Sequence, residues 1–233
     1  SAARQSTSIT AIAPDATSVL YNDSGTNTGV AGSTNAEFGN VVALVNAMGN
    51  NGSTEPAKRF YKYARPYRWS SNVVLIPALV PAKSATPSTD GGFTSGHSAE
   101  AVRGAVGMAY VLPERYQEMV ARGLELGENR IIAGMHSPLD VISGRVQAQA
   151  IAAANLLDAT TAATKAAAVT QAHATLMAKT GTTADNFYDY AHSGTSANDR
   201  FTDYAANKAA YIRRMTFGFT QTMKGGNELS LSF

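Results

Sequence analysis

Apolar residues recur with helical spacing through most of the second half of this 233-residue chain. In the first stripe the apolar positions are Ala99, Val102, Val106 and Ala109. Stripes of the same kind cover residues 116–130, 139–179 and 201–215. Steps of three or four residues place side chains on one face of an α-helix, and no segment alternates as a half-buried strand does. The sequence therefore predicts an all-α protein, and its length favours a single domain.

Two shorter helices and one long connection are predicted upstream of these stripes. Turn formers follow both helices, which we expect over residues 35–48 and 55–64. Between Ser70 and Phe93, three prolines and a Gly-Gly pair predict a connection without a regular element. A loop of this length in a compact domain usually serves function.

The two ends of the chain differ from the predicted helical domain. Residues 1–34 are rich in Ser, Thr, Asn and Gly, which predicts an extended N-terminal arm. Residues 217–233 show no helical period and predict an irregular C-terminal tail. The compact helical domain is therefore expected over residues 35–216.

Composition excludes several classes of protein. The chain has no Cys, which excludes disulfides, Cys-ligated metals and a thiol nucleophile. A formal net charge of +2, without a clustered basic face, does not indicate a nucleic-acid partner. No run approaches the ~18 consecutive apolar residues that predict a membrane-spanning helix. The absence of Cys and the start at Ser1 favour a periplasmic or secreted location.

The first polar motif pairs Lys58 with Arg65, which Pro66 follows. The two cations are seven residues apart, so we expect them on one face of a helix. A solvated basic face is one interpretation. The other is a pair of cations directed at one anion, for which the planar guanidinium of Arg suits phosphate oxygens.

The second motif is a glycine-rich loop that opens into a helix, Gly91 to Ser98. Backbone N–H groups at a helix N-terminus form a natural anion site. Ser95 also fits an ordinary N-cap. His97 falls in the first turn, where the helix dipole favours a neutral imidazole unless an anion is bound.

The third motif runs from Asn129 to Asp140. Its end, Ser-Pro-Leu-Asp, fits a capped helix start with Pro at the first position. Asp140 also suits a second role, accepting the N–H of His136 and fixing its tautomer. Arg130 lies close to the face of the apolar stripe, so we expect it to need an anionic partner or ligand.

Together the three motifs read Lys-x6-Arg-Pro, Ser-Gly-His and Arg-x5-His-x3-Asp, in this order. This pattern resembles the type 2 phosphatidic acid phosphatase superfamily, which includes bacterial class A non-specific acid phosphatases, lipid phosphatases and vanadium haloperoxidases. The matching positions are Lys58, Arg65, Pro66, Ser95, Gly96, His97, Arg130, His136 and Asp140. Thr94 and Asn129 depart from the Pro and Ser usual in the family, which affects rate and substrate preference more than reaction class.

The resemblance implies a single compact helical-bundle domain and a metal-independent phosphomonoester hydrolase, in particular a soluble acid phosphatase. It implies no cofactor and no metal. The expected ligands are a small phosphate ester, inorganic phosphate or vanadate. Family precedent favours a homodimer.

By the same resemblance, His136 is the nucleophile and forms a phosphohistidine. Asp140 orients its ring, and His97 acts as general acid and then general base. The residues implied in holding the phosphoryl oxygens are Lys58, Arg65, Ser95, Gly96 and Arg130. Phosphoryl transfer mainly requires positioning and positive charge, which three cations and a helix N-terminus supply.

Other interpretations stay open at this point. A vanadium-dependent haloperoxidase would use the same pocket, and a soluble phosphatase could act on lipid phosphates. A helical protein that merely binds an anion is a non-enzymatic alternative. We expect His173 and His192 to be non-catalytic and the aromatic segment 187–190 to serve core packing or a subunit contact rather than substrate binding. The aromatic residues flanking the motifs, which fit either a leaving-group pocket or core packing, are Tyr67, Trp69 and Phe93.

Overall fold

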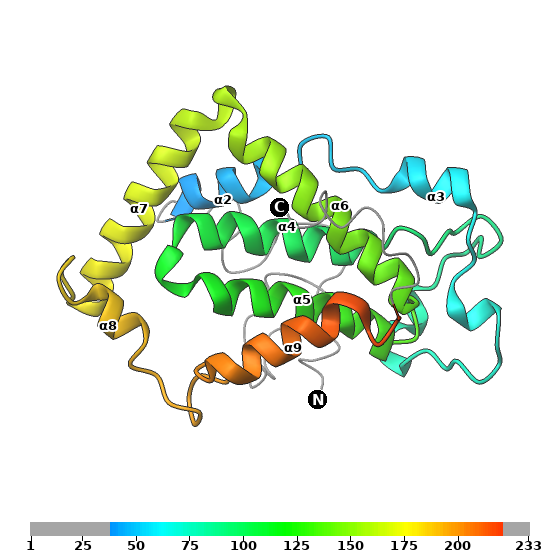
Figure 1. The fold of residues 1–233 in the computed structure, drawn as a ribbon. Coiled ribbons are helices and arrows are strands. Elements are labelled where there is room, and N and C mark those ends of the chain that lie inside the picture. The colour runs from blue at the N-terminus through cyan, green and yellow to red at the C-terminus, as the bar shows by residue number, and fades with distance from the viewer. Residues whose placement is uncertain (1–37, 221–233) are drawn as a thin grey trace.

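A computed structural model describes residues 38–220 of the chain (Figure 1). The helices are α2 (Gly39–Ala47), α3 (Glu55–Tyr61), α4 (Gly96–Val111), α5 (Tyr116–Ile132), α6 (Pro138–Leu157), α7 (Ala162–Thr180), α8 (Phe187–Ala191) and α9 (Tyr204–Thr216). Short 3-10 helices join them: η2 (Pro66–Arg68), η3 (Pro77–Ala82), η4 (Pro113–Arg115) and η5 (Ala159–Thr161). Within residues 38–220 the extended backbone pairs only in one isolated bridge, between Ala64 and Gly91. The all-α prediction is confirmed.

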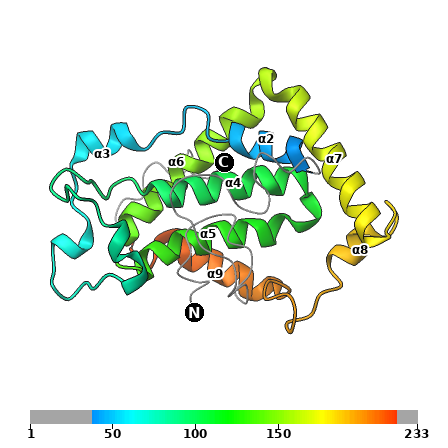
Figure 2. The same cartoon turned by 180° about the vertical axis from the view of Figure 1, so that it is seen from behind.

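Helix α4 forms the centre of the molecule and packs chiefly against α5 and α6. Helices α4 and α5 run side by side in both views, and α9 lies along α5 (Figures 1 and 2). Small residues allow this close packing. A Cβ added to Gly123 of α5 would lie 2.6 Å from the Cβ of Ala105 on α4, so this crossing requires glycine.

The main hydrophobic cluster joins α2, α4, α6 and α7. Its buried members are Leu44, Met48, Val111, Ala152, Ala168 and Ala172. This cluster lies away from the end of the molecule that carries α3, η2 and η3, which is drawn in cyan and teal (Figure 1). The end built from helix termini and connections has a smaller hydrophobic cluster of its own, formed by Leu79, Ala133 and Met135.

Local signals predict where the two central helices begin. Ser95 is the N-cap of α4, and its Oγ accepts a hydrogen bond from the Ser98 N–H at 3.3 Å. Ser137 caps α6, with Pro138 in the first turn and Asp140 completing a capping box. Both starts were expected from the sequence, because caps depend on neighbours within a few residues.

Two sequence predictions near α3 are wrong. The helix ends at Tyr61 rather than residue 64, because Lys62 adopts a left-handed conformation with φ of 48°. Arg65 is extended, as residues preceding proline usually are. Lys58 and Arg65 therefore do not share a helix face. In addition, the 70–93 connection contains the 3-10 helix η3, for which Pro77 supplies the first residue.

The remaining differences lie at the ends of the chain and in α8. The sequence did not predict α8 as a helix, and it buries Phe187 while Tyr188 and Tyr190 stay exposed. The predicted arm over 1–34 lies outside the described residues, as does most of the predicted tail. Among the helices of residues 38–220, none is long and apolar enough to span a membrane.

Candidate active site

The three polar motifs meet where α4 begins, α5 ends and α6 begins. The Ser95 N–H donates to the backbone carbonyl of Asp140 at 3.1 Å, which ties the glycine-rich loop to α6. The N–H groups of Met135 and His136 both donate to the carbonyl of Arg130, at 3.1 and 3.2 Å. Backbone hydrogen bonds thus hold the second and third motifs side by side, independently of any ligand.

His136 lies at the centre of this arrangement, with 1% of its side chain exposed. Its Nε2 lies 2.9 Å from Nη1 of Arg65, and its Nδ1 lies 3.3 Å from Oδ2 of Asp140. Since a guanidinium can only donate, Nε2 must accept. The imidazole is therefore neutral, and its proton sits on Nδ1, facing Asp140.

The electrostatic surroundings favour the same neutral form. The pKa of His136 is lowered from 6.5 to about 3, chiefly by burial and also by the charges of Arg65 and Arg130, while Asp140 acts in the opposite direction. A buried imidazole between two guanidinium groups loses its proton because the charged form is poorly solvated and repelled. At any mildly acidic or neutral pH, Nε2 therefore carries a lone pair and no proton.

Asp140 serves two partners at once. Its Oδ2 accepts from the Ser137 N–H at 2.9 Å, and its own N–H donates to Ser137 Oγ at 3.2 Å. The same Oδ2 faces His136. The capping and orienting interpretations both hold in the geometry. A Cβ on Gly92 would lie 2.9 Å from this oxygen, so the loop approaches Asp140 this closely only with glycine there.

Arg65 reaches the site from the extended segment after α3. Its Nη1 also donates to the Met135 carbonyl at 3.3 Å. Its other edge pairs with Asp90, Nε to Oδ2 at 2.5 Å and Nη2 to Oδ1 at 2.9 Å. Sequence reasoning missed Asp90, because an acidic residue beside a Gly-Gly turn carries no signal of its own.

The other two cations lie on either side of this centre. Arg130, in the last turn of α5, is buried as predicted for an Arg near the apolar face, and its charge reaches His136. Lys58 pairs with Glu55 at 2.7 Å. A Cβ on Gly96 would lie 3.7 Å from Lys58 Nζ, so the ammonium group sits beside the first residue of α4. Lys58 and Arg65 thus approach the site from different elements.

The start of α4 supplies Ser95, Gly96 and His97. Ser95 is fully buried, and its Oγ lies 2.8 Å from the Ser98 Oγ. His97 is partly buried in the first turn. The two departures from the family pattern, Thr94 and Asn129, are both buried. All eight predicted site residues therefore belong to the same end of the molecule.

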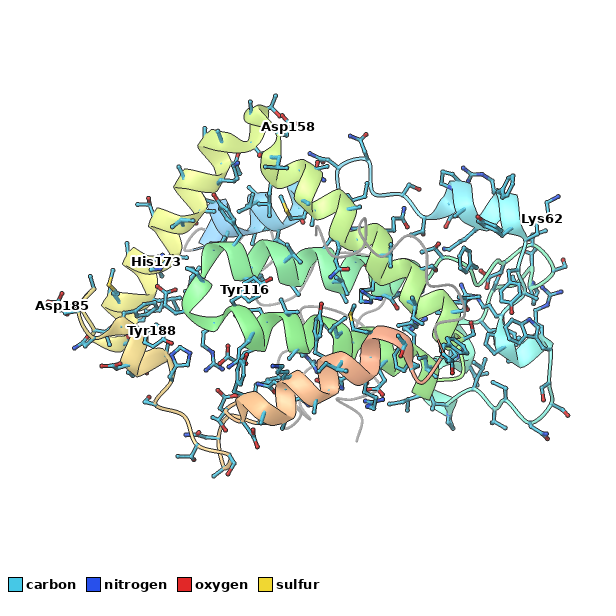
Figure 3. The ribbon with its side chains drawn as sticks, in the orientation of Figure 1. Lys62, Tyr116, Asp158, His173, Asp185 and Tyr188 are labelled. Atoms are coloured by element: carbon cyan, nitrogen blue, oxygen red, sulfur yellow. The ribbon has the colours of Figure 1, made fainter. Side chains whose placement is uncertain are left out.

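Other candidate residues lie elsewhere or play different parts. His173 is on α7, where Nε2 lies 3.0 Å from Glu114 Oε1, and Figure 3 shows it at the end opposite Lys62. His192 follows α8, near Tyr188. Trp69 is 48% exposed and packs edge-on against Tyr63, so core packing does not describe it.

An aromatic pair and the question of a metal site complete the description of this end of the molecule. Phe93 packs edge-on against Tyr61, with ring centroids 4.9 Å apart, beside the start of α4. Within residues 38–220, no three His, Asp or Glu side chains are placed to hold a metal ion. What the described part of the site offers is a neutral imidazole among cations, which suits an anionic ligand.

Comparison with known proteins agrees with this chemistry. A family model described as the PAP2 superfamily matches residues 37–162. A non-specific acid phosphatase of Salmonella typhi is 33% identical over 109 residues, which is 47% of this chain and 42% of that protein. A non-specific acid phosphatase of Providencia stuartii is 29% identical over 96 residues, or 41% of this chain and 37% of that protein.

The relatives and the family model match different shares of their own length and of this chain. The match spans about two fifths of the Salmonella typhi relative's length. The family model, by contrast, covers more than half of this chain and contains all three motifs, from Lys58 to Asp140. The chain belongs to the PAP2 superfamily.

Proposed function

We propose that the protein is a phosphomonoester hydrolase that works through a phosphohistidine on His136 and needs no metal. The observation that carries the proposal is the state of His136: neutral, with Nδ1–H facing Asp140 and the Nε2 lone pair facing Arg65. A nucleophile of this kind suits an electrophile that brings negative charge, because the charges of Arg65 and Arg130 act on it. Relatives named non-specific acid phosphatase support a phosphoester as that electrophile.

In the first step, Nε2 of His136 attacks phosphorus in line with the leaving oxygen. The N–P bond forms as the P–O bond breaks, and His97 gives its proton to the departing alkoxide. Asp140 stabilises the charge that develops on the imidazole. Lys58, Arg65 and Arg130, with the start of α4, hold the equatorial oxygens.

In the second step, water attacks the phosphohistidine. His97, now neutral, takes a proton from the water as the N–P bond breaks. Inorganic phosphate leaves, His136 is again neutral and His97 is again charged. Every proton and bond is accounted for by residues of this chain, without a metal.

Variants of the two histidines test these roles. We expect His136→Ala to abolish hydrolysis of both p-nitrophenyl phosphate and an alkyl phosphate. In the first step, His97→Ala should spare release of p-nitrophenol, a leaving group that needs no acid, and slow release of the alkyl alcohol by roughly a hundredfold or more. His173→Ala is the matched control and should change neither rate. Equal losses of first-turnover release from both esters in His97→Ala would contradict its role as acid.

Substrate class and the competing chemistry follow from one further set of assays. Rates across nucleotide, sugar, phytate and lipid phosphates would identify the preferred leaving group and test the lipid-phosphate alternative. Vanadate with bromide and peroxide tests the haloperoxidase alternative, which predicts halogenation where we expect only inhibition. A homodimeric state, on the precedent of the resemblance, and a periplasmic or secreted location, which the absence of Cys suits, complete the proposal.

A further inference from the structure

Asp90 forms a two-point ion pair with Arg65 in the candidate site, although it belongs to none of the three motifs. It lies in the connection between η3 and α4 and pairs with both Nε and Nη2 of Arg65, at 2.5 and 2.9 Å. Arg65 is 12% exposed and Asp90 is 20% exposed, so the pair is largely shielded from water. Two-point pairs of this geometry are among the stronger hydrogen-bonded ion pairs in proteins.

The backbone, and not only the side chains, brings these two residues together. The Gly92 N–H donates to the Tyr63 carbonyl at 2.6 Å, and Ala64 and Gly91 form an antiparallel bridge. The bridge and this hydrogen bond thus hold residues 63–64 beside residues 91–92, which places Asp90 next to Arg65. A contact fixed in this way is set before any substrate arrives.

The pair decides how Arg65 faces the nucleophile. Asp90 occupies Nε and Nη2, which leaves Nη1 to donate to the Met135 carbonyl and to Nε2 of His136. In this arrangement Nη1 covers the lone pair that would attack phosphorus. An arriving phosphoryl oxygen can take over this N–H, and the lone pair is released at the moment when the electrophile is present.

Asp90 also places a negative charge beside a cation that is expected to hold phosphate. The negative charge of Asp90 and the positive charge of Arg65 act in opposite directions on a bound phosphate. Both act on substrate and product alike, because substrate and product are phosphate dianions. Binding that is equally strong in both does not speed the chemical step, and a pocket that is too positive retains its product.

We propose that Asp90 is a positioning residue that directs Nη1 of Arg65 at His136 and weakens the pocket's hold on phosphate, so that product can leave. This inference rests on the proposed function, since it concerns phosphate at the same site. It assigns to the 70–93 connection a specific task, which is tuning the charge of the pocket.

Two substitutions separate charge from position. Asp90→Asn removes the charge and keeps the shape, so we expect phosphate and vanadate to bind roughly threefold more tightly, or better, since a unit charge a few ångströms away acts at this scale. Asp90→Glu keeps the charge and moves the guanidinium, so kcat on p-nitrophenyl phosphate should fall by about tenfold with phosphate affinity little changed. Titration calorimetry with inorganic phosphate and steady-state kinetics measure the two effects.

The matched control is the pair of Arg115 and Asp199 at the far end of the molecule. Its Nη2–Oδ2 distance is also 2.5 Å, and the side chains are 21% and 19% exposed. Asp199→Asn should lower the melting temperature much as Asp90→Asn does, and leave phosphate affinity and kcat unchanged. A merely structural role for Asp90 predicts that the two variants behave alike.

The outcomes distinguish this inference from the proposed function. If the wild type hydrolyses phosphate esters and Asp90→Asn binds phosphate no more tightly than the wild type, the inference is overturned and the function stands. If phosphate binds more tightly to Asp90→Asn but no ester is hydrolysed, only the function fails. Unchanged kcat in Asp90→Glu would contradict the positioning role even if Asp90→Asn did not fold. A wild type that neither binds phosphate nor hydrolyses esters overturns both.

Discussion

At the scale of single residues, the protonation state of His136 governs the account. The imidazole is neutral because it is buried between Arg65 and Arg130, and Asp140 only partly offsets this effect. A nucleophilic imidazole must be neutral. The environment that lowers the free energy of unfolding at acidic pH therefore also prepares the attacking nitrogen. Stability and reactivity are therefore linked at this residue.

The low pKa of His136 predicts how stability depends on pH. Between pH 6.5 and about 3, the unfolded chain protonates this residue while the folded protein keeps it neutral. The unfolded state binds more protons, so the free energy of unfolding falls as the pH drops through this window, by on the order of a few kcal/mol. Urea unfolding at several pH values should show a smaller loss for His136→Gln. Parallel curves for the two proteins would count against the buried neutral imidazole.

Gly92 makes a second prediction at this scale. A methyl group there would lie 2.9 Å from Oδ2 of Asp140 and must displace either the loop or the carboxylate. We expect Gly92→Ala to lower kcat by roughly tenfold or more, because small displacements at the reacting centre are costly. Gly39→Ala is the control, since a Cβ there meets nothing within 4 Å. Similar activity in both variants would show that the close approach does not matter.

At the scale of elements, helix termini build the site. Helices α4 and α6 begin there with side-chain caps, and α5 ends there with Arg130 in its last turn. The caps fix the helices and also fix the functional groups, because Asp140 is both the third residue of the capping box and the partner of His136. Local folding signals and catalytic groups are therefore the same residues.

Removal of the α6 cap should thus affect both stability and rate. Ser137→Ala loses the acceptor for the Asp140 N–H, which costs about 1 kcal/mol of stability. We expect kcat to fall as well, because Asp140 is held less firmly. Asp203→Ala removes the equivalent cap of α9, where the side chain accepts from the Ala206 N–H at 2.9 Å. That variant should lose similar stability, seen in thermal melts, at unchanged kcat; a matching loss of kcat would refute the coupling.

The element scale also explains which predictions succeeded. Starts of α4 and α6 follow from caps within a few residues, and the stripes of α4 and α5 follow from helical spacing, so the sequence predicts them. The place of Arg65 beside Asp90, by contrast, depends on the bridge between Ala64 and Gly91. A pairing across some 25 residues leaves no local trace, and Asp90 was missed for the same reason.

At the scale of the whole molecule, a small net charge of +2 hides a strong local separation of charge. One end brings Arg65 and Arg130 to His136 and Lys58 to the start of α4. Away from that centre, the buried carboxylates of α5 pair with arginines of the C-terminal region, as Glu128 does with Arg214 at 2.8 Å and Glu125 does with Arg200. These pairs fasten the C-terminal region to α5.

The central claim is that His136 carries the phosphoryl group, and trapping that species tests it most directly. Wild-type protein is mixed with 32P-labelled p-nitrophenyl phosphate and quenched within milliseconds. The quench is alkaline, because phosphohistidine survives base. In the wild type we predict label on the peptide that contains His136. His136→Ala should carry no label, and His97→Ala should accumulate more label, because it hydrolyses the intermediate slowly. Turnover by His136→Ala at the wild-type rate, or label on another residue, would contradict the account.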